Sequence, residues 1–292
     1  MSTSGQFDGI APTPQSAWDM RAAGNFIGGG SGTGLLIFTA AAAYLGQSDR
    51  GLLFAGLVLV GLGLFSVFLE IGRPFRAANV MIGIKYSWMT REAWVAGMLF
   101  PLGGAALLWP GLLPLVGVPA VLYLYCQARI LHATKGIPAW RQPLMVPLII
   151  VTALVEGSGV MVVAGAFTVV PVWAPAALMA AVAARLLVWM AYRRQLAGGG
   201  APLLAAAAAV RFSMPFTLGG NLAPVLLLVV AGAEPALAEA ALPAAGLAAV
   251  LGGWALKAAI VTSFAHTQGF AIPFTPARGA GRPGPGAFPG WR

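Results

Sequence analysis

Long apolar segments alternate with short polar gaps along most of this 292-residue chain. A helix needs about 20 predominantly apolar residues to cross the hydrocarbon core of a bilayer. On this criterion we expect spanning helices at about 24–45, 51–69, 92–108, 113–131, 144–166, 172–192, 215–232 and 241–263. The Ala-rich stretch 203–210 is followed by Arg211 and Pro215, so we expect it to form a short surface helix that leads into the seventh span. The pattern predicts an all-α integral membrane protein, a bundle of about eight transmembrane helices.

Positive charges fall almost entirely in every second gap between these segments. Of the 17 Lys and Arg residues, Arg50 alone falls in the opposite gaps, while Arg185 and Lys257 fall within spans. Gaps rich in Lys and Arg stay on the cytoplasmic side of a membrane. With an even number of spans, we therefore expect both termini on one basic, cytoplasmic face. The same asymmetry accounts for the net charge of +9 without nucleic acid as a partner.

The amino-acid composition excludes a soluble fold and several kinds of metal or haem site. Hydrophobic residues make up 59% of the chain and charged residues 9%, values at which a soluble fold would expose too much hydrocarbon to water. The single cysteine, Cys126, provides too few thiolates for an internal disulfide, an iron–sulfur cluster or a structural zinc site, so no metal site is expected. A diheme cytochrome b needs four imidazoles, whereas this chain has His132 and His266 alone. One haem between these two histidines stays open as a third hypothesis.

The chain is expected to have three parts. Residues 1–23 form a cytoplasmic N-terminal segment, 24–265 the eight-helix domain, and 266–292 a tail too rich in Pro and Gly to form a helix. The tail is either a disordered end or an extended strap that docks on a soluble partner through its aromatic residues, Phe270, Phe274, Phe288 and Trp291.

The first predicted span begins with an unusual run of small residues, from Gly24 to Gly34. Small residues four positions apart, such as Gly28 and Gly32, let a neighbouring helix approach closely. A flat ligand such as a quinone ring could use the same smooth surface, with Asn25 donating a hydrogen bond. The two explanations are compatible.

Two carboxylates flank the loop between the second and third predicted spans. Glu70 ends the second span and Glu92 opens the third, and the loop carries Arg73, Arg76 and Arg91. Glu92 could simply cap its helix, where the helix dipole favours negative charge. Alternatively, the two carboxylates deliver protons to a redox ligand. The loop arginines could also bind acidic lipid or a partner surface.

Three ionisable residues fall inside predicted spans, where unpaired charge is costly and usually functional. These residues are Glu156, Arg185 and Lys257. We expect Glu156 to pair with Arg185 or Lys257. Such a pair would either stabilise the bundle or continue a proton path towards the opposite face.

Several of these motifs together resemble a known family. The loop Gly72-Arg73-Pro74-Phe75-Arg76, the helix start Ser87-x-x-x-Arg91-Glu92 and the Gly-rich first helix are similar to the membrane anchor subunits of molybdoenzymes. These anchors form the DmsC-like branch of the NrfD/PsrC superfamily. Within it, residues 18–26 are most similar to anchors of the phenylacetyl-CoA:acceptor oxidoreductase type.

The resemblance implies a haem-free subunit of the bacterial cytoplasmic (inner) membrane that exchanges electrons between the quinone pool, ubiquinone or menaquinone, and an iron–sulfur subunit. Iron–sulfur clusters and molybdopterin would reside in partner subunits on the basic face. By position, Glu92 corresponds to the carboxylate associated with the quinol site, and Glu70 stands where some relatives have a histidine. The residues expected around the quinone headgroup are Asn25, Gly28, Gly29, Arg73, Arg76, Trp88, Arg91, Tyr123, Tyr125 and Arg129.

A competing hypothesis is a small-solute or ion transporter. In that case Glu156, Arg185 and Lys257 would line a midplane site built from broken helices. Prolines within the spans, among them Pro215 and Pro224, permit such breaks. The concentration of polar residues at one face favours the anchor instead.

Overall fold

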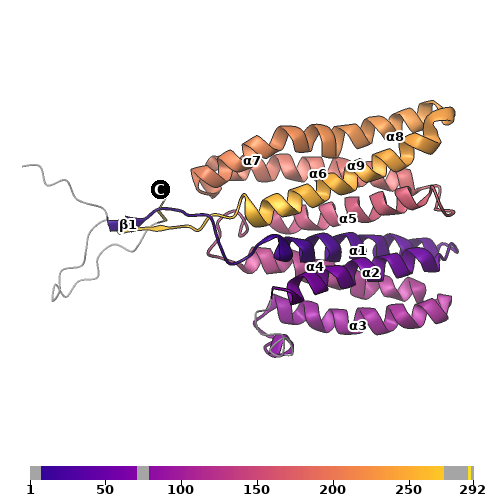
Figure 1. Ribbon diagram of the computed structural model, residues 1–292, viewed down its shortest axis with the longest axis horizontal. Coiled ribbons are helices and arrows are strands. Elements are labelled where there is room, and N and C mark those ends of the chain that lie inside the picture. Colours follow the sequence, from indigo (N-terminus) through magenta and orange to yellow (C-terminus); the bar gives the residue numbers. More distant parts are fainter. Residues whose placement is uncertain (1–7, 71–78, 273–288, 291–292) are drawn as a thin grey trace, which may run out of the picture.

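The computed structural model describes residues 8–70, 79–272 and 289–290, and helices dominate that part of the chain. The helices are α1 (Met20–Tyr44), α2 (Arg50–Phe68), α3 (Trp88–Leu108), α4 (Leu113–Ala133), α5 (Met145–Ala164), α6 (Ala174–Gln195), α7 (Leu203–Pro215), α8 (Ala223–Ala233) and α9 (Pro235–Thr262). They lie side by side in one elongated bundle, with α3 at one edge and α7 and α8 at the other (Figure 1).

Within the described residues, seven helical units are long and apolar enough to cross a membrane, which confirms the prediction of a helical membrane protein. Six of these units contain α1, α2, α4, α5, α6 and α9, and α7 and α8 together make the seventh. Among the described residues, α3 is the remaining helix of comparable length, and it packs against α2 and α4. It carries Arg91 and Glu92 near its start, which lowers its hydropathy. The third predicted span, 92–108, is therefore a helix of the bundle with a polar beginning.

One prediction about the seventh span was wrong. The stretch 203–210 is not a separate surface helix, because α7 continues through a π-helical turn (η4, Phe216–Leu222) into α8. Pro215 has no N–H to donate, and a wider turn absorbs that loss without ending the helix. Asn221 supports the turn by donating a hydrogen bond from Nδ2 to the Phe216 carbonyl oxygen at 2.9 Å. The resulting unit runs from Leu203 to Ala233.

Side-chain caps place two helix starts earlier than the apolar pattern does. Asp19 caps α1 by accepting the Arg21 N–H at 2.7 Å, and Ser87 caps α3 by accepting the Thr90 N–H at 3.2 Å. Helix α3 therefore begins at Trp88, and Glu92 lies in its second turn with its side chain buried. The capping role considered for Glu92 belongs to Ser87.

Helix α1 is the central element of the bundle, in contact with α2, α4, α5 and α9 (Figure 1). Its glycines face four neighbouring helices, and three of them, Gly24, Gly28 and Gly32, face α2. A methyl group would overlap α2 at Gly28, α4 at Gly29, α9 at Gly30 and α5 at Gly34. Close helix packing thus accounts for the run of small residues.

The two described ends of the chain meet at one end of the bundle. Strand β1 (Asp8–Ile10) pairs antiparallel with β2 (Phe270–Ile272), and the pair extends beyond the helices (Figure 1). Ile10 and Phe270 lie opposite each other in this ribbon, and their exposed fractions are 56% and 39%. Of the tail aromatics proposed to dock on a partner, Phe274, Phe288 and Trp291 lie outside the described residues.

We predict that replacing Gly34 with Leu destabilises the protein far more than replacing Gly97 with Leu. A side chain at position 34 meets the backbone of α5 and would push the two helices apart, whereas Gly97 of α3 is exposed and its Cβ would meet no atom within 4 Å. Overpacking of this kind costs about 1–3 kcal/mol or more. Thermal unfolding of the purified variants in detergent measures the difference. Equal melting temperatures would contradict the central role of α1.

Candidate functional site

A carboxyl group is buried between α1, α3 and α4, near the end of the bundle from which β1 and β2 extend. Glu92 of α3 is 5% exposed, and Asn25, Tyr123 and Gln127 surround its carboxyl group. We call these four residues the Glu92 cluster. Gln127 donates from Nε2 to the Asn25 carbonyl oxygen at 2.9 Å, which ties α4 to α1. At ~1.5 Å per residue, Glu92 lies only about 6 Å from the start of its helix.

The Glu92 cluster brings together buried polar atoms that form few hydrogen bonds. Within the described part of the chain, Asn25 Oδ1, Glu92 Oε1, Tyr123 Oη and Gln127 Oε1 are buried without a hydrogen bond of normal geometry, although Asn25, Tyr123 and Gln127 lie close enough to the Glu92 carboxyl group to interact with it. Buried polar groups in proteins are nearly always hydrogen-bonded, so such a concentration needs an explanation. A ligand that carries carbonyl or hydroxyl oxygens would supply the missing partners.

Four residues predicted for the site form a second group on α3 and α4. The Arg91 guanidinium lies 4.1 Å from the centroid of the Trp88 ring, and that of Arg129 lies 4.8 Å from it. Tyr125 packs edge-on against Trp88 with the centroids 5.7 Å apart. We call this group the arginine–tryptophan cluster. Two cations on one aromatic ring concentrate positive charge beside the start of α3.

Arg91 also orders the loop that precedes α3. It donates from Nε to the Ile84 carbonyl oxygen at 2.9 Å and from Nη2 to the Lys85 carbonyl oxygen at 2.8 Å. The other predicted loop arginines, Arg73 and Arg76, lie outside the described residues.

Glu70 lines a small pocket together with Asn25. The pocket has a volume of about 30 Å³ and is lined by Trp18, Ala22, Asn25, Phe26, Val67, Glu70, Met89 and Ile130. This space holds about one water molecule. A quinone ring is larger than this space. Burial raises the pKa of the Glu70 carboxyl group, and the negative charge of Asp19 adds to the effect.

A separate pair of opposite charges is buried deeper in the bundle. Lys257 Nζ lies 2.6 Å from Glu156 Oε2, and both side chains are fully buried. Ser31 Oγ donates to the same carboxylate oxygen at 2.8 Å and accepts a hydrogen bond from Trp254 Nε1 at 2.9 Å. Of the two partners expected for Glu156, Lys257 is therefore the one that it contacts.

Arg185 does not belong to this pair. It donates to Asn221 Oδ1 at 3.0 Å, to the Ala249 carbonyl oxygen at 3.0 Å and to the Gly220 carbonyl oxygen. All of these acceptors are neutral. Glu156 is thus paired with Lys257, whereas Arg185 makes its hydrogen bonds to η4 and α9.

Two neighbouring glycines of α1 lie between the Glu92 cluster and the Glu156–Lys257 pair. Gly29 faces Gln127 and Tyr123 of the Glu92 cluster, and the next residue, Gly30, faces Lys257. The backbone of a single helix therefore separates the Glu92 cluster from the Glu156–Lys257 pair. Gln127 was missed in the sequence analysis, although a polar amide within an apolar span is a usable signal.

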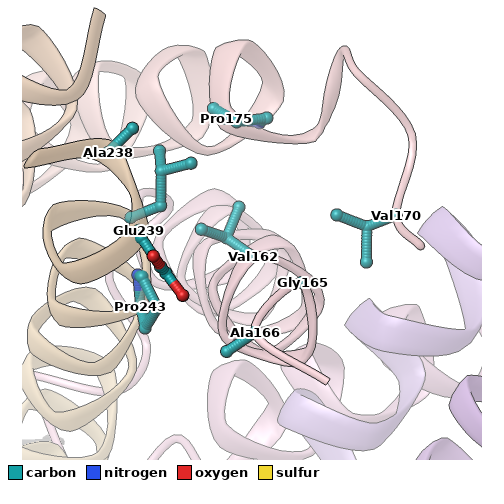
Figure 2. A pocket seen from close by; sticks show the side chains of 9 residues that line it. Val162, Gly165, Ala166, Val170, Pro175, Ala238, Glu239 and Pro243 are labelled. Atoms are coloured by element: carbon teal, nitrogen blue, oxygen red, sulfur yellow. The ribbon is translucent and has the colours of Figure 1, made fainter. Parts of the chain in front are cut away.

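A larger pocket lies at the other end of the bundle and is less suited to chemistry. It has a volume of about 170 Å³ and is lined mainly by apolar residues of α5, α6 and α9. Figure 2 shows Glu239 as the carboxylate among these side chains. None of the residues predicted for the site lines this pocket, so the Glu92 cluster remains the better candidate.

Comparison with known proteins does not add to these observations. No protein-family model matches the chain, and no curated protein is similar enough to count as a relative. The resemblance to molybdoenzyme anchors therefore rests on the residues described above.

We predict that the Glu156–Lys257 pair is strongly coupled. Replacing Lys257 with Met leaves a buried carboxylate without its counter-ion and should lower the free energy of unfolding by about 3–5 kcal/mol. Adding Glu156→Gln to that variant removes the charge and should recover most of the loss. Thermal unfolding of both single variants and the double variant completes the cycle. Additive losses would mean that the pair contributes no mutual stabilisation.

Proposed function

We propose that this protein is the membrane anchor and quinone-reactive subunit of a molybdopterin oxidoreductase complex. The observation that carries the proposal is the Glu92 cluster, where three polar side chains from α1 and α4 surround one buried carboxyl group and hydrogen-bonding capacity is left unused. A quinone headgroup has two oxygens that accept or donate hydrogen bonds and exchange protons. The cluster offers amide, phenol and carboxyl groups that match this requirement.

Each residue of the site has a separate task in this proposal. Asn25, Tyr123 and Gln127 hold the headgroup oxygens, and Glu92 gives or takes a proton at one of them. Glu70 exchanges that proton with water at the end of the bundle, since it lines the pocket beside Asn25 and is itself partly exposed. A bound quinone would supply two-electron, two-proton chemistry.

The electrons require a partner outside the bilayer. The end of the bundle near Glu92 carries most of the positive charge, with Arg21, Lys135 and Arg141 among the basic residues at helix ends and in loops. We place the iron–sulfur subunit and the molybdopterin subunit there, on the cytoplasmic face of a bacterial inner membrane. The β1–β2 ribbon, with Ile10 and Phe270 exposed, provides an additional contact for that partner.

A transporter is the second candidate, and one observation favours it. Glu156, Arg185 and Lys257 are fully buried, and a π-helical turn interrupts the seventh span beside Arg185. In transporters, such breaks bind the transported solute. Here the charged groups are already bonded to protein atoms, which weakens this candidate.

The proposal is tested on the complex purified through this chain in mild detergent. We expect molybdenum or tungsten, iron and acid-labile sulfide, with two co-purifying soluble subunits and no haem band in the absorption spectrum. A chain that purifies alone and free of metal would favour the transporter, and a haem band would favour a cytochrome b.

On the same complex, we predict that Glu92→Gln reduces quinol turnover by about 10²–10⁴-fold, because the amide cannot exchange a proton. Assembly should be unchanged, since Gln retains the shape of the side chain. The control is Glu239→Gln, which alters a carboxylate at the other end of the bundle and should leave turnover unchanged. Turnover is measured from the absorbance change of a short-chain quinone or quinol analogue with an artificial electron donor or acceptor, in the direction that the parent complex catalyses. Equal activities of the two variants would remove Glu92 from the mechanism.

A further inference from the structure

The wide turn in the seventh span exposes backbone oxygens to the interior of the bundle. In η4, Gly220 packs directly against Gly252 of α9, and a methyl group at either position would crowd the backbone of the other. This contact brings two carbonyl oxygens close together, that of Gly220 in the turn and that of Ala249 in α9. The side-chain oxygen of Asn221 is the third acceptor at the same place.

Arg185 of α6 fills the space between these oxygens. Its Nε and both Nη atoms each donate a hydrogen bond to one of them, and its Cζ lies 5.2 Å from the centroid of the Phe216 ring. The side chain is 0% exposed. Within the described residues the ion pairs are Arg21–Asp19 and Lys257–Glu156, so no carboxylate lies within ion-pair distance of this guanidinium.

Neutral oxygens together with an aromatic face form the kind of environment that binds a cation within a membrane. Carbonyl oxygens replace the hydration shell of ions in membrane proteins, and a ring face adds attraction. A planar guanidinium directs its N–H groups in fixed directions, and three acceptors in the structure match them. The three oxygens and the Phe216 ring therefore have the geometry of a guanidinium-binding site, and the guanidinium group of the Arg185 side chain occupies it.

We propose that the wide turn of the seventh span is a guanidinium-binding site that Arg185 fills permanently. Removal of the side chain opens a site for guanidinium or methylguanidinium, made by Asn221, Gly220, Ala249 and Phe216. In the intact protein, the tethered cation holds η4 against α6 and α9. This inference is independent of the quinone chemistry proposed above.

The test is chemical rescue of Arg185→Ala. The variant should unfold at a lower temperature than the parent protein, because three buried oxygens lose their donors. Millimolar guanidinium chloride, well below denaturing concentrations, should raise its melting temperature saturably by about 2–5 °C. Sodium chloride and urea at the same concentration should have no such effect.

Two matched variants make the test specific. Arg193→Ala removes a partly exposed arginine of the same helix, which donates to Ser213 Oγ at 2.9 Å, and should show no response to guanidinium. Adding Asn221→Leu to Arg185→Ala removes one acceptor and should weaken the rescue at least 10-fold in concentration.

If Arg185→Ala yields no folded protein, guanidinium supplied during expression should recover the yield. A folded variant that does not respond to guanidinium overturns the proposal, and so does an unfolded one whose yield does not recover. A response of equal size in Arg193→Ala would also overturn it, because the effect would then be nonspecific.

Discussion

The close contact between the backbone of α1 and its neighbours is the constraint on which the rest of the structure depends. Helices in lipid gain little from burying apolar surface against each other, so they depend on close packing. Successive glycines give α1 a different neighbour on each side, with α2, α4, α5 and α9 arranged around it. One helix thereby joins the first half of the bundle, α1 to α4, to the second half.

This central position also organises the polar groups. The Glu92 cluster and the Glu156–Lys257 pair lie on different sides of α1, against Gly29 and Gly30. Larger residues there would displace Gln127 or Lys257 and leave buried polar groups without partners, which is expensive in a hydrocarbon environment. The glycines are thus required both for packing and for placing the chemistry.

The apolar segments could be located from sequence because spanning length and hydropathy are properties of each segment alone. Helix starts were less predictable, since Ser87 and Asp19 act through side-chain caps in polar flanks. Pro215 suggested an end of a helix, but the π-helical turn beyond it depends on contacts with α6 and α9. The arginine–tryptophan cluster could be predicted, because it follows from residue spacing along α3 and α4. Which cation pairs with Glu156, Lys257 or Arg185, could not, because it depends on how α6 and α9 are rotated.

The buried charges of Glu156, Lys257 and Arg185 influence where the protein can exchange protons with water. Glu156 carries one negative charge, while Lys257 and Arg185 are two cations, so these three residues leave an excess of positive charge at that depth. In a medium of low dielectric constant, such an excess opposes the entry of another cation, including a proton. For the proposed quinone chemistry, this favours exchange at the near end of the bundle, where Glu70 borders both water and the pocket beside Asn25. Between the two roles considered for the Glu156–Lys257 pair, the charge balance therefore favours stabilisation of the bundle over a path across it.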